Sequence, residues 1–370
     1  MKKPKPLQSN SVNAKLLLPI LFATATPLAA QYSLEHPLRS TGEKMMAVFE
    51  PQRAVLQSSS ALIMDGRDES AYGVIVSADG HILTKHSEYR TLKEPLVVVD
   101  KKRYQSVELL GVDTRWDVCL IKIEAEGLKP VEYAPTSKIA LGSWVIANGS
   151  TSRFKRRALM GVLSAQQRRI KPAGGLVMGI SIKKDDKKGL VIQDVDEKGG
   201  AHEAGIQKGD IILTVDDKKV EEVKELVEHL KENHYTGSKA LMGLKRDKEE
   251  MEIYVRLMPS HQMKPPPNRN DQMSGAFSKR RSDFPKVMQH TILANNRSVG
   301  GPLLDIQGRC IGMNIARANR AESFAIPVEE LQEIAGRLMS GKPEPVEDAK
   351  QGDPDAAQTA DVKETEEAAE

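Results

Sequence analysis

The chain has 370 residues, of which 39% are hydrophobic and 28% are charged, and its formal net charge is +3. This length and composition allow two or three globular domains and exclude a small disulfide-stapled protein. Because aromatic residues make up only 4%, the cores must consist mainly of Val, Ile, Leu, Met and Ala, which suits short strands.

The first thirty residues have the order of a secretory signal. Four lysines and no acidic residue precede the apolar run Leu16–Ala30, and a polar segment follows it. A membrane anchor is the alternative, but the run is shorter than the roughly 20 residues that a bilayer requires, and two prolines interrupt it. The sequence therefore predicts a signal peptide over 1–30 and export to the periplasm or the extracellular space, with no membrane span after signal removal.

Residues 40–130 contain short apolar runs of period two, each closed by a turn signal, such as YGVIVSADG, PLVVVD and DVCLIKI. Regularly spaced strands of this kind indicate an antiparallel barrel or sandwich. A second set of strands begins over 131–171, with LGSWVIANG and GVLSA. The pattern predicts a mainly β chain that contains at least two strand sets.

The pattern changes over 172–259. Here Val223, Leu226, Val227 and Leu230 recur at helical spacing within a set of strand-like runs. One helix with a few strands indicates a separate α+β module. A linker rich in Pro, Asn, Ser and basic residues is predicted over 260–285, because it contains few apolar groups.

Strands resume over 286–340, which also contains a closing helix with a regular apolar face. The second strand set is therefore expected to be split around the α+β module. Residues 341–370 carry ten acidic residues and three lysines from position 342 onward, and they are expected to form a disordered acidic tail.

Basic residues cluster at 153–157, 168–171 and 279–281. Solvated loops are the first interpretation of such runs, and binding of anionic envelope polymers is a weaker one. No nucleic-acid partner is expected. No cluster of His, Cys or carboxylate residues has metal-ligand spacing, so the sequence predicts neither a metal nor a cofactor.

Four segments together resemble the HtrA/Deg family of trypsin-like proteases. They are YGVIVSADGHILT, GVDTRWDVCLIKI, LGSWVIANG with GVLSA, and GGPLLDIQGRCIGMNIA, in this order. The resemblance implies a trypsin-like double β-barrel with an α+β PDZ domain inserted into the second barrel. The family normally carries its PDZ domains after the protease domain, so an internal module is a departure. The resemblance also assigns Cys119 and Cys310 to different barrels, which favours two free buried thiols.

The family's mechanism requires a Ser nucleophile, a His base, an Asp that orients the His, and backbone N–H groups that bind the oxyanion. The resemblance aligns Asp117 with the aspartate, but it aligns Ser87 with the base and Val299 with the nucleophile. Arg297 takes the place of the glycine that shapes the oxyanion loop. Because loss of a triad member costs on the order of 10⁴ to 10⁶ in rate, these residues predict a protein without protease activity.

An alternative triad remains open. His86 and Ser298 each lie one residue before the expected position, so a bulge in both loops could form a triad of His86, Asp117 and Ser298. In a strand, however, a slip of one residue turns a side chain to the opposite face. Asp117 also has a structural interpretation, as an acceptor of backbone N–H bonds in a turn.

The module over 172–259 resembles bacterial PDZ domains in VMGISIK and AHEAGIQKGDIILTVDDKKV. The resemblance implies binding of a peptide C-terminus by strand addition. A purely structural module, with its edge strand covered by the barrels, is the alternative. The predicted peptide-binding residues are Val177, Met178, Gly179, Ile180, Ile182, Val223, Leu226, Val227 and Leu230.

The sequence as a whole favours an exported pseudoprotease that binds polypeptides through its PDZ-like domain, with an adaptor, chaperone-like or regulatory role. Protein C-termini, active protease relatives and further copies of the chain are the candidate partners. An active serine endopeptidase that uses the shifted triad is the alternative function.

Overall fold

The computed structural model describes residues 35, 42–149, 157–187, 189–260, 276–293 and 297–341. The predicted signal peptide and acidic tail lie outside these residues, apart from residue 341 of the tail. Residues 1–48 form a unit separate from residues 49–370 and contribute the helix α1 (Glu43–Val48). Among the described residues, no helix is both long and apolar enough to cross a membrane.

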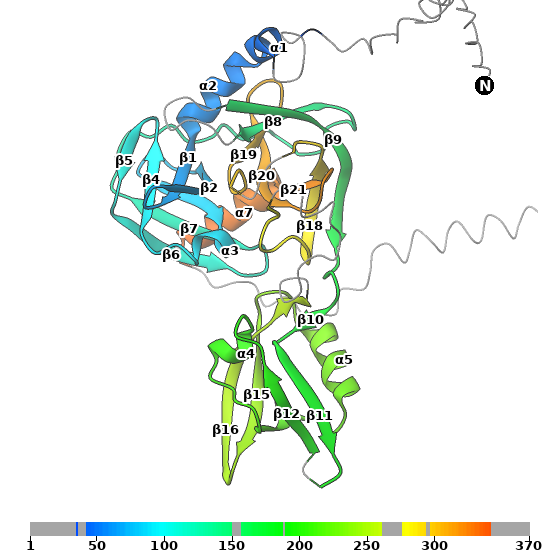
Figure 1. Ribbon diagram of the computed structural model, residues 1–370. Coiled ribbons are helices and arrows are strands. Elements are labelled where there is room, and N and C mark those ends of the chain that lie inside the picture. Colours follow the sequence, from blue (N-terminus) through cyan, green and yellow to red (C-terminus); the bar gives the residue numbers. More distant parts are fainter. Residues whose placement is uncertain are drawn as a thin grey trace, which may run out of the picture. The chain divides into compact units, whose positions relative to one another are not determined.

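The first strand set forms a seven-stranded antiparallel sheet in the order β5-β4-β1-β2-β3-β7-β6 (Figure 1). Its strands are β1 (Ser60–Asp65), β2 (Asp68–Ile75), β3 (His81–Lys85), β4 (Pro95–Val99), β5 (Lys102–Tyr104), β6 (Val107–Asp113) and β7 (Val118–Ile123). Helix α2 (Glu50–Ser59) leads into β1, and the short helix α3 (His86–Tyr89) directly follows β3. Alternating Val, Ile and Ala side chains from these strands fill its core, as the period-two pattern predicts.

The second strand set is a closed six-stranded barrel in the order β18-β21-β20-β19-β8-β9. Its strands are β8 (Trp144–Gly149), β9 (Arg157–Ile170), β18 (Phe284–His290), β19 (Pro302–Leu304), β20 (Cys310–Arg317) and β21 (Ser323–Pro327). Strand β9 pairs with β18, although more than one hundred residues of chain separate them. Helix α7 (Val328–Met339) follows, with Val328, Leu331, Ile334 and Leu338 buried on the predicted face.

An α+β unit lies between β9 and β18 in the sequence (Figure 1). Its larger sheet contains β11 (Ile180–Asp185), β12 (Gly189–Val195), β13 (Ile211–Val215), β14 (Lys218–Lys219), β15 (Lys239–Arg246) and β16 (Glu249–Arg256). Strands β10 (Leu176–Val177) and β17 (Met258–Pro259) form a two-stranded sheet, and the helices are α4 (Gly200–Glu203) and α5 (Val223–Asn233). The predicted fold class, a mainly β chain with an α+β module inserted into the second strand set, is confirmed.

The end of the expected linker differs from the prediction. Residues 261–275 lie outside the described part, but β18 begins at Phe284, and Ser278, Arg280, Ser282 and Asp283 are all buried. The interpretation of the basic run 279–281 as a solvated loop is therefore wrong for Arg280. The Arg280 guanidinium is buried because it donates hydrogen bonds to several carbonyl oxygens. Composition alone does not reveal such partners.

Cys119 and Cys310 are buried and unpaired, in β7 and in β20. Burial raises the pKa of the Cys310 thiol to about 12. Both thiols therefore act as small apolar core groups, which agrees with the sequence analysis.

Candidate functional site

The first candidate site centres on Asp117, the residue before β7. Strand β3 pairs with β7 so that Lys85 lies opposite Val118, which brings the start of α3 beside Asp117. The backbone N–H of His86 donates to the Asp117 carbonyl oxygen at 2.9 Å. Asp117 has φ of +60°, a left-handed conformation that Asp tolerates better than most residues.

Both carboxylate oxygens of Asp117 have donors from β3 and α3. The Ser87 N–H donates to Oδ1 at 2.8 Å, and the Ser87 hydroxyl donates to Oδ2 at 2.8 Å. The Lys85 ammonium forms a short ion pair with the same Oδ2. The structure thus brings together Ser87 and Asp117, which the alignment assigns to the base and aspartate positions, and adds Lys85, which that alignment did not identify.

Lys85 is fully buried, so its charge requires compensation. Besides Asp117, its Nζ donates to the carbonyl oxygen of Arg280 at 3.0 Å and lies 5.7 Å from the centre of the Phe284 ring. Burial alone would raise the pKa of the Asp117 carboxyl, but the Lys85 ammonium and the Arg280 guanidinium outweigh it and leave that pKa below its ordinary value. Asp117 is therefore an anion held by fixed cations.

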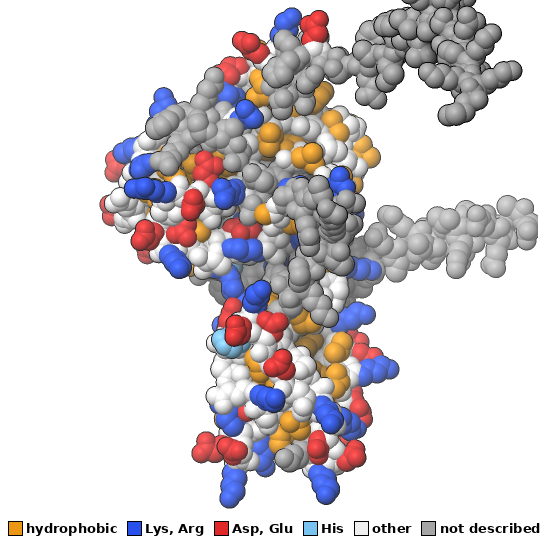
Figure 2. All heavy atoms as spheres, viewed as in Figure 1, with side chains coloured by type: hydrophobic (Ala, Val, Ile, Leu, Met, Phe, Trp, Pro, Cys, Tyr) orange, Lys and Arg blue, Asp and Glu red, His pale blue; other side chains and the backbone are white. Residues whose placement is uncertain are grey.

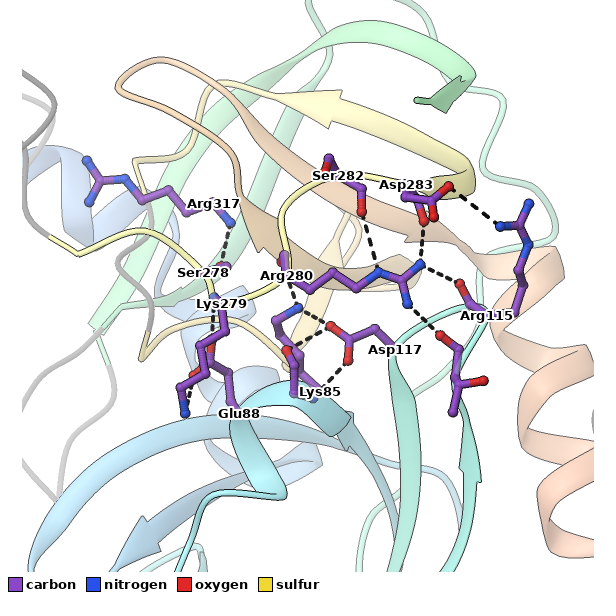
Figure 3. A network of polar contacts seen from close by, with 12 residues as sticks. Lys85, Glu88, Arg115, Asp117, Ser278, Lys279, Arg280, Ser282, Asp283 and Arg317 are labelled. Atoms are coloured by element: carbon purple, nitrogen blue, oxygen red, sulfur yellow. Dashed lines mark hydrogen bonds and ion pairs between the residues drawn. The ribbon is translucent and has the colours of Figure 1, made fainter. Parts of the chain in front are cut away.

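Residues 278–283, which we call the buried segment, complete this network (Figure 3). The Arg280 guanidinium donates to the carbonyl oxygens of Thr114, at 2.5 Å, and Arg115, at 2.9 Å, and also to that of Asp283. The Lys279 N–H donates to Oε1 of Glu88 in α3 at 3.0 Å. The segment therefore binds several loops of the first sheet at once.

The buried segment also binds strand β20 of the second barrel. The Ser278 N–H donates to the Arg317 carbonyl oxygen at 3.3 Å, and the Arg317 N–H donates to the Ser278 hydroxyl at 2.9 Å. This reciprocal pairing resembles one rung of a strand ladder. The chain itself thus occupies the end of β20 next to Asp117 and its partners.

The loop before β19 includes residues 298 and 299, where the family resemblance expects a nucleophile. Neither position carries an exposed nucleophile. Val299 is 1% exposed, and its carbonyl oxygen accepts a hydrogen bond from the Tyr72 N–H at 2.8 Å. Ser298 is fully buried, whereas Arg297 is exposed. Gly300 has φ of +89°, and a Cβ there would lie 2.2 Å from the Tyr72 carbonyl oxygen, so glycine is required at this turn.

His86 does not form the alternative triad by hydrogen bonding. Among the described residues, its imidazole makes no hydrogen bond to Asp117 or to Ser298. Burial lowers the pKa of His86, and the nearby Asp117 carboxylate opposes this effect only in part. The two oxygens that an orienting Asp would offer to the imidazole are used by Lys85 and Ser87.

The second candidate site is the groove between β11 and α5. In the larger sheet β11 pairs with β12 alone, so its other edge carries no strand among the described residues. Val223 is 36% exposed and Val227 53% exposed on α5, whereas Leu226 and Leu230 are buried in the core. Figure 2 shows hydrophobic side chains among charged ones on the surface near these elements.

The loop that precedes β11 has free amide groups. The carbonyl oxygens of Met178 and Gly179 accept hydrogen bonds from the N–H groups of Ala201, at 2.9 Å, and Asp196, at 2.8 Å. Within the described residues, the N–H groups of Met178 and Gly179 have no acceptor. Gly179 has φ of +86°, which a side chain would disfavour. The two amides can therefore donate to an anionic group.

Comparisons with known proteins match two domain types. A PDZ domain model matches residues 177–257, and a trypsin-like peptidase domain model matches residues 71–200. In these matches the chain is similar to the HtrA/Deg-like trypsin-fold family. This HtrA/Deg-like chain has PDZ and peptidase-like domains, in agreement with the sequence resemblance.

Curated relatives cover a limited part of the HtrA/Deg-like chain. A probable periplasmic serine endoprotease DegP-like from Ectopseudomonas mendocina (strain ymp) is 34% identical over 98 residues, which are 26% of this chain and 21% of that protein. A protein of the same description from Pseudomonas fulva (strain 12-X) is 32% identical over 121 residues, 32% of this chain and 25% of that protein. The chain thus spans only about a fifth to a quarter of the length of these relatives.

Two solved structures are similar to the HtrA/Deg-like chain at low identity. A serine endoprotease from Yersinia pestis is 18% identical, covering 57% of this chain and 97% of that chain, with a TM-score of 0.29. The HtrA-type protease AlgW with a decapeptide is 14% identical, covering 59% of this chain and 99% of that chain, also with a TM-score of 0.29.

Proposed function

We propose that the protein is an exported pseudoprotease that binds polypeptide C-termini through its PDZ-like groove. The observation that carries the first half is the use of both Asp117 oxygens by Lys85 and Ser87. A Ser-His-Asp site needs this carboxylate to orient an imidazole and to stabilise the imidazolium. Here a permanent cation already neutralises it, and Ser87 is a poor general base at neutral pH.

The buried segment gives a second, independent argument against proteolysis. A trypsin-like enzyme needs room beside the serine and histidine of its triad for a substrate chain. In this protein Ser278 forms hydrogen bonds with Arg317 on one side. On the other side, the carbonyl oxygen of Arg280 accepts a hydrogen bond from Lys85. A peptide could enter only after these hydrogen bonds were broken and the buried Arg280 side chain was exposed. Breaking a buried, paired charge in this way is costly.

The groove supports the binding half of the proposal. An extended peptide can pair with the free edge of β11, place apolar side chains against Val223 and Val227, and direct its carboxylate at the amides of Met178 and Gly179. The free edge is the opposite of what a covered, purely structural module would have.

The alternative function is an active endopeptidase with a triad of His86, Asp117 and Ser298. The burial of Ser298 and the occupied oxygens of Asp117 disfavour it. A nucleophile without solvent exposure cannot reach a scissile carbonyl unless its loop rearranges.

A serine-reactive fluorophosphonate probe and a casein-cleavage assay distinguish the two functions. The folded wild-type protein is expected to show neither labelling nor cleavage, with a DegP-like endoprotease as the positive control. Labelling that disappears in Ser298→Ala, together with cleavage that disappears in His86→Ala, would establish the shifted triad and reject the pseudoprotease.

Peptide binding is tested with one apolar C-terminal peptide in two forms, with a free carboxylate and with an amidated end. The free form is expected to bind weakly and the amidated form to lose binding, because the loop amides require an anion. Equal affinity of the two forms would reject carboxylate recognition.

Export forms part of the same proposal. The two curated relatives are described as periplasmic, and residues 1–30 have the pattern of a signal. N-terminal sequencing of the protein from a fractionated native host is expected to give a mature chain that begins near residue 31 in the exported fraction.

A further inference from the structure

Three side chains of the PDZ-like unit converge on one point. Nε2 of His229 in α5 lies 2.8 Å from Oδ2 of Asp216, and Nε2 of His234 lies 2.6 Å from the same oxygen. Asp216 belongs to the turn between β13 and β14, and His234 follows α5 directly. The nitrogen and oxygen atoms of the three residues lie within 4.8 Å of one another.

We propose that Asp216, His229 and His234 bind a zinc ion. Imidazole nitrogen and carboxylate oxygen are ligands that zinc accepts, and three protein ligands leave a fourth position for water. A tetrahedral zinc ion with bonds of roughly 2.0–2.1 Å needs ligand atoms about 3.3 Å apart. The two imidazoles would therefore move outward by about half an ångström, which partly exposed side chains can do.

The partners of His234 orient it as a metal ligand. The Ser238 hydroxyl donates its proton to the Tyr235 carbonyl oxygen at 2.8 Å, so the same oxygen acts as acceptor toward Nδ1 of His234 at 3.1 Å. Nδ1 therefore carries the proton, and the lone pair of Nε2 points at the carboxylate. A lone pair and a carboxylate oxygen this close require a cation between them, either a proton or a metal.

The carboxylate is already prepared for a cation. The Leu241 N–H donates to Oδ1 at 3.0 Å and so fixes the carboxylate, while Oδ2 faces the imidazoles. Such fixed outer contacts are typical of metal ligands.

His229 needs one adjustment. Nδ2 of Asn233 lies 3.3 Å from Nδ1 of His229, and it also donates to the His229 carbonyl oxygen at 2.9 Å. Zinc at Nε2 would shift the imidazole proton to Nδ1, and the Asn233 amide would turn to present its oxygen. Zinc would then join the end of α5 to the β13–β14 turn and stiffen the helix that borders the groove.

The test uses full-length protein without a histidine tag, stripped with a chelator and titrated with Zn²⁺ in a calorimeter and with Co²⁺ for visible absorption. One saturable ion per chain, a tetrahedral Co²⁺ spectrum and a higher Tm are expected. His229→Gln and His234→Gln should each remove all three effects, while His202→Gln, on a surface helix, retains them.

Two further variants separate a built site from chance binding. Ser238→Ala should weaken zinc binding by about 10–100-fold, because it removes the group that fixes Nδ1 of His234. Asn233→Asp should strengthen it, since a carboxylate accepts the Nδ1 proton of His229. If the folded wild-type chain shows no saturable zinc, or if His234→Gln binds it equally well, the three residues form hydrogen bonds only and the proposal is rejected.

Discussion

The surroundings of Asp117 and the groove beside β11 differ in how their polar groups are satisfied. Around Asp117, the cations of Lys85 and Arg280 and the carboxylates of Asp117, Glu88 and Asp283 are buried, and loops of both strand sets supply their partners. Beside β11, a strand edge carries no partner strand among the described residues, two loop amides have no acceptor there, and Val223 and Val227 are exposed. One region has become a closed part of the interior, while the other keeps the unsatisfied groups that a ligand can pair with.

Under the proposed function, this difference describes a trypsin-like scaffold that keeps its fold without its protease chemistry. Asp117 remains charged, and the buried cations Lys85 and Arg280 compensate that charge. Binding function is then expected where hydrogen-bonding capacity remains, which is the PDZ-like unit.

The strongest way to break the closed region is to leave one of its charges unpaired. Asp117→Asn retains the shape and tolerates the left-handed backbone, but it leaves the Lys85 ammonium buried beside a neutral amide. We expect a loss of about 3–5 kcal/mol in the free energy of unfolding, and a similar loss in Lys85→Met. Urea unfolding of the two variants measures both losses.

The double variant is the control for this prediction. Lys85→Met combined with Asp117→Asn removes both charges, so its loss should be well below the sum of the single losses. Additive losses, or single losses below about 1 kcal/mol, would mean that the pair contributes little and that the region is not closed by charge.

The second prediction compares two neighbours in one basic run. Arg280 is buried and donates to several carbonyl oxygens, whereas Arg281 is half-buried against the Phe277 ring. Arg280→Met should cost about 3 kcal/mol, because it leaves buried carbonyls without donors, and Arg281→Met should cost less than about 1 kcal/mol. Thermal and urea unfolding measure both losses. If Arg280→Met and Arg281→Met lowered stability equally, the buried hydrogen bonds of Arg280 would not be important for the fold.

Much of the fold follows from local patterns in the sequence. Period-two runs predicted the strands of both sets, and helical periodicity predicted a closing helix with an apolar face, which is α7. The pairing of β9 with β18 required the family resemblance, because no local pattern tells which distant strands pair. Helix α2 was not predicted, since only one of its three buried positions, Gln52, Leu56 and Ser59, is apolar.

The candidate site was predicted only in part. Alignment assigned Ser87 to the base position and Asp117 to the aspartate position, and it indicated the groove, but it did not identify Lys85, Glu88 or the buried segment. Charged side chains are normally exposed, so a sequence does not reveal the few that fold inward with partners. The convergence of His229 and His234 on Asp216 was missed for a related reason: their turn and helix meet only in the folded unit.

The third prediction concerns His290, which is fully buried in β18. Burial lowers its pKa from the ordinary 6.5 to about 4, so the unfolded chain binds more protons between these two values. Stability is fully present above pH 6.5, falls as the pH drops toward 4, and then levels off. Between pH 7 and pH 5 this group should remove about 2 kcal/mol.

Urea unfolding at the two pH values measures this loss. His290→Asn should reduce the difference between pH 7 and pH 5, whereas His202→Asn, on the surface of the PDZ-like unit, should not. If the difference in the free energy of unfolding between pH 7 and pH 5 were unchanged in His290→Asn, the acid sensitivity would belong to other groups. The burial of His290 would then not distinguish the barrel from the groove.

The smallest expected effect tests the open region. Val227 is 53% exposed on α5 and contributes little to the core, so Val227→Lys should leave the free energy of unfolding nearly unchanged. If a peptide side chain packs on this position, the substitution should weaken binding of an apolar C-terminal peptide by about 1–2 kcal/mol, or roughly five- to thirtyfold.

Tyr254→Lys is the matched control, because Tyr254 is 64% exposed on β16 at the other edge of the same sheet. Fluorescence anisotropy with a labelled peptide compares the two variants. A loss confined to Val227→Lys assigns the ligand to the β11 edge, since both variants add the same charge to the same unit. Equal losses would indicate a general charge effect, and no loss in either would leave the groove without a ligand and the PDZ-like unit with a structural role.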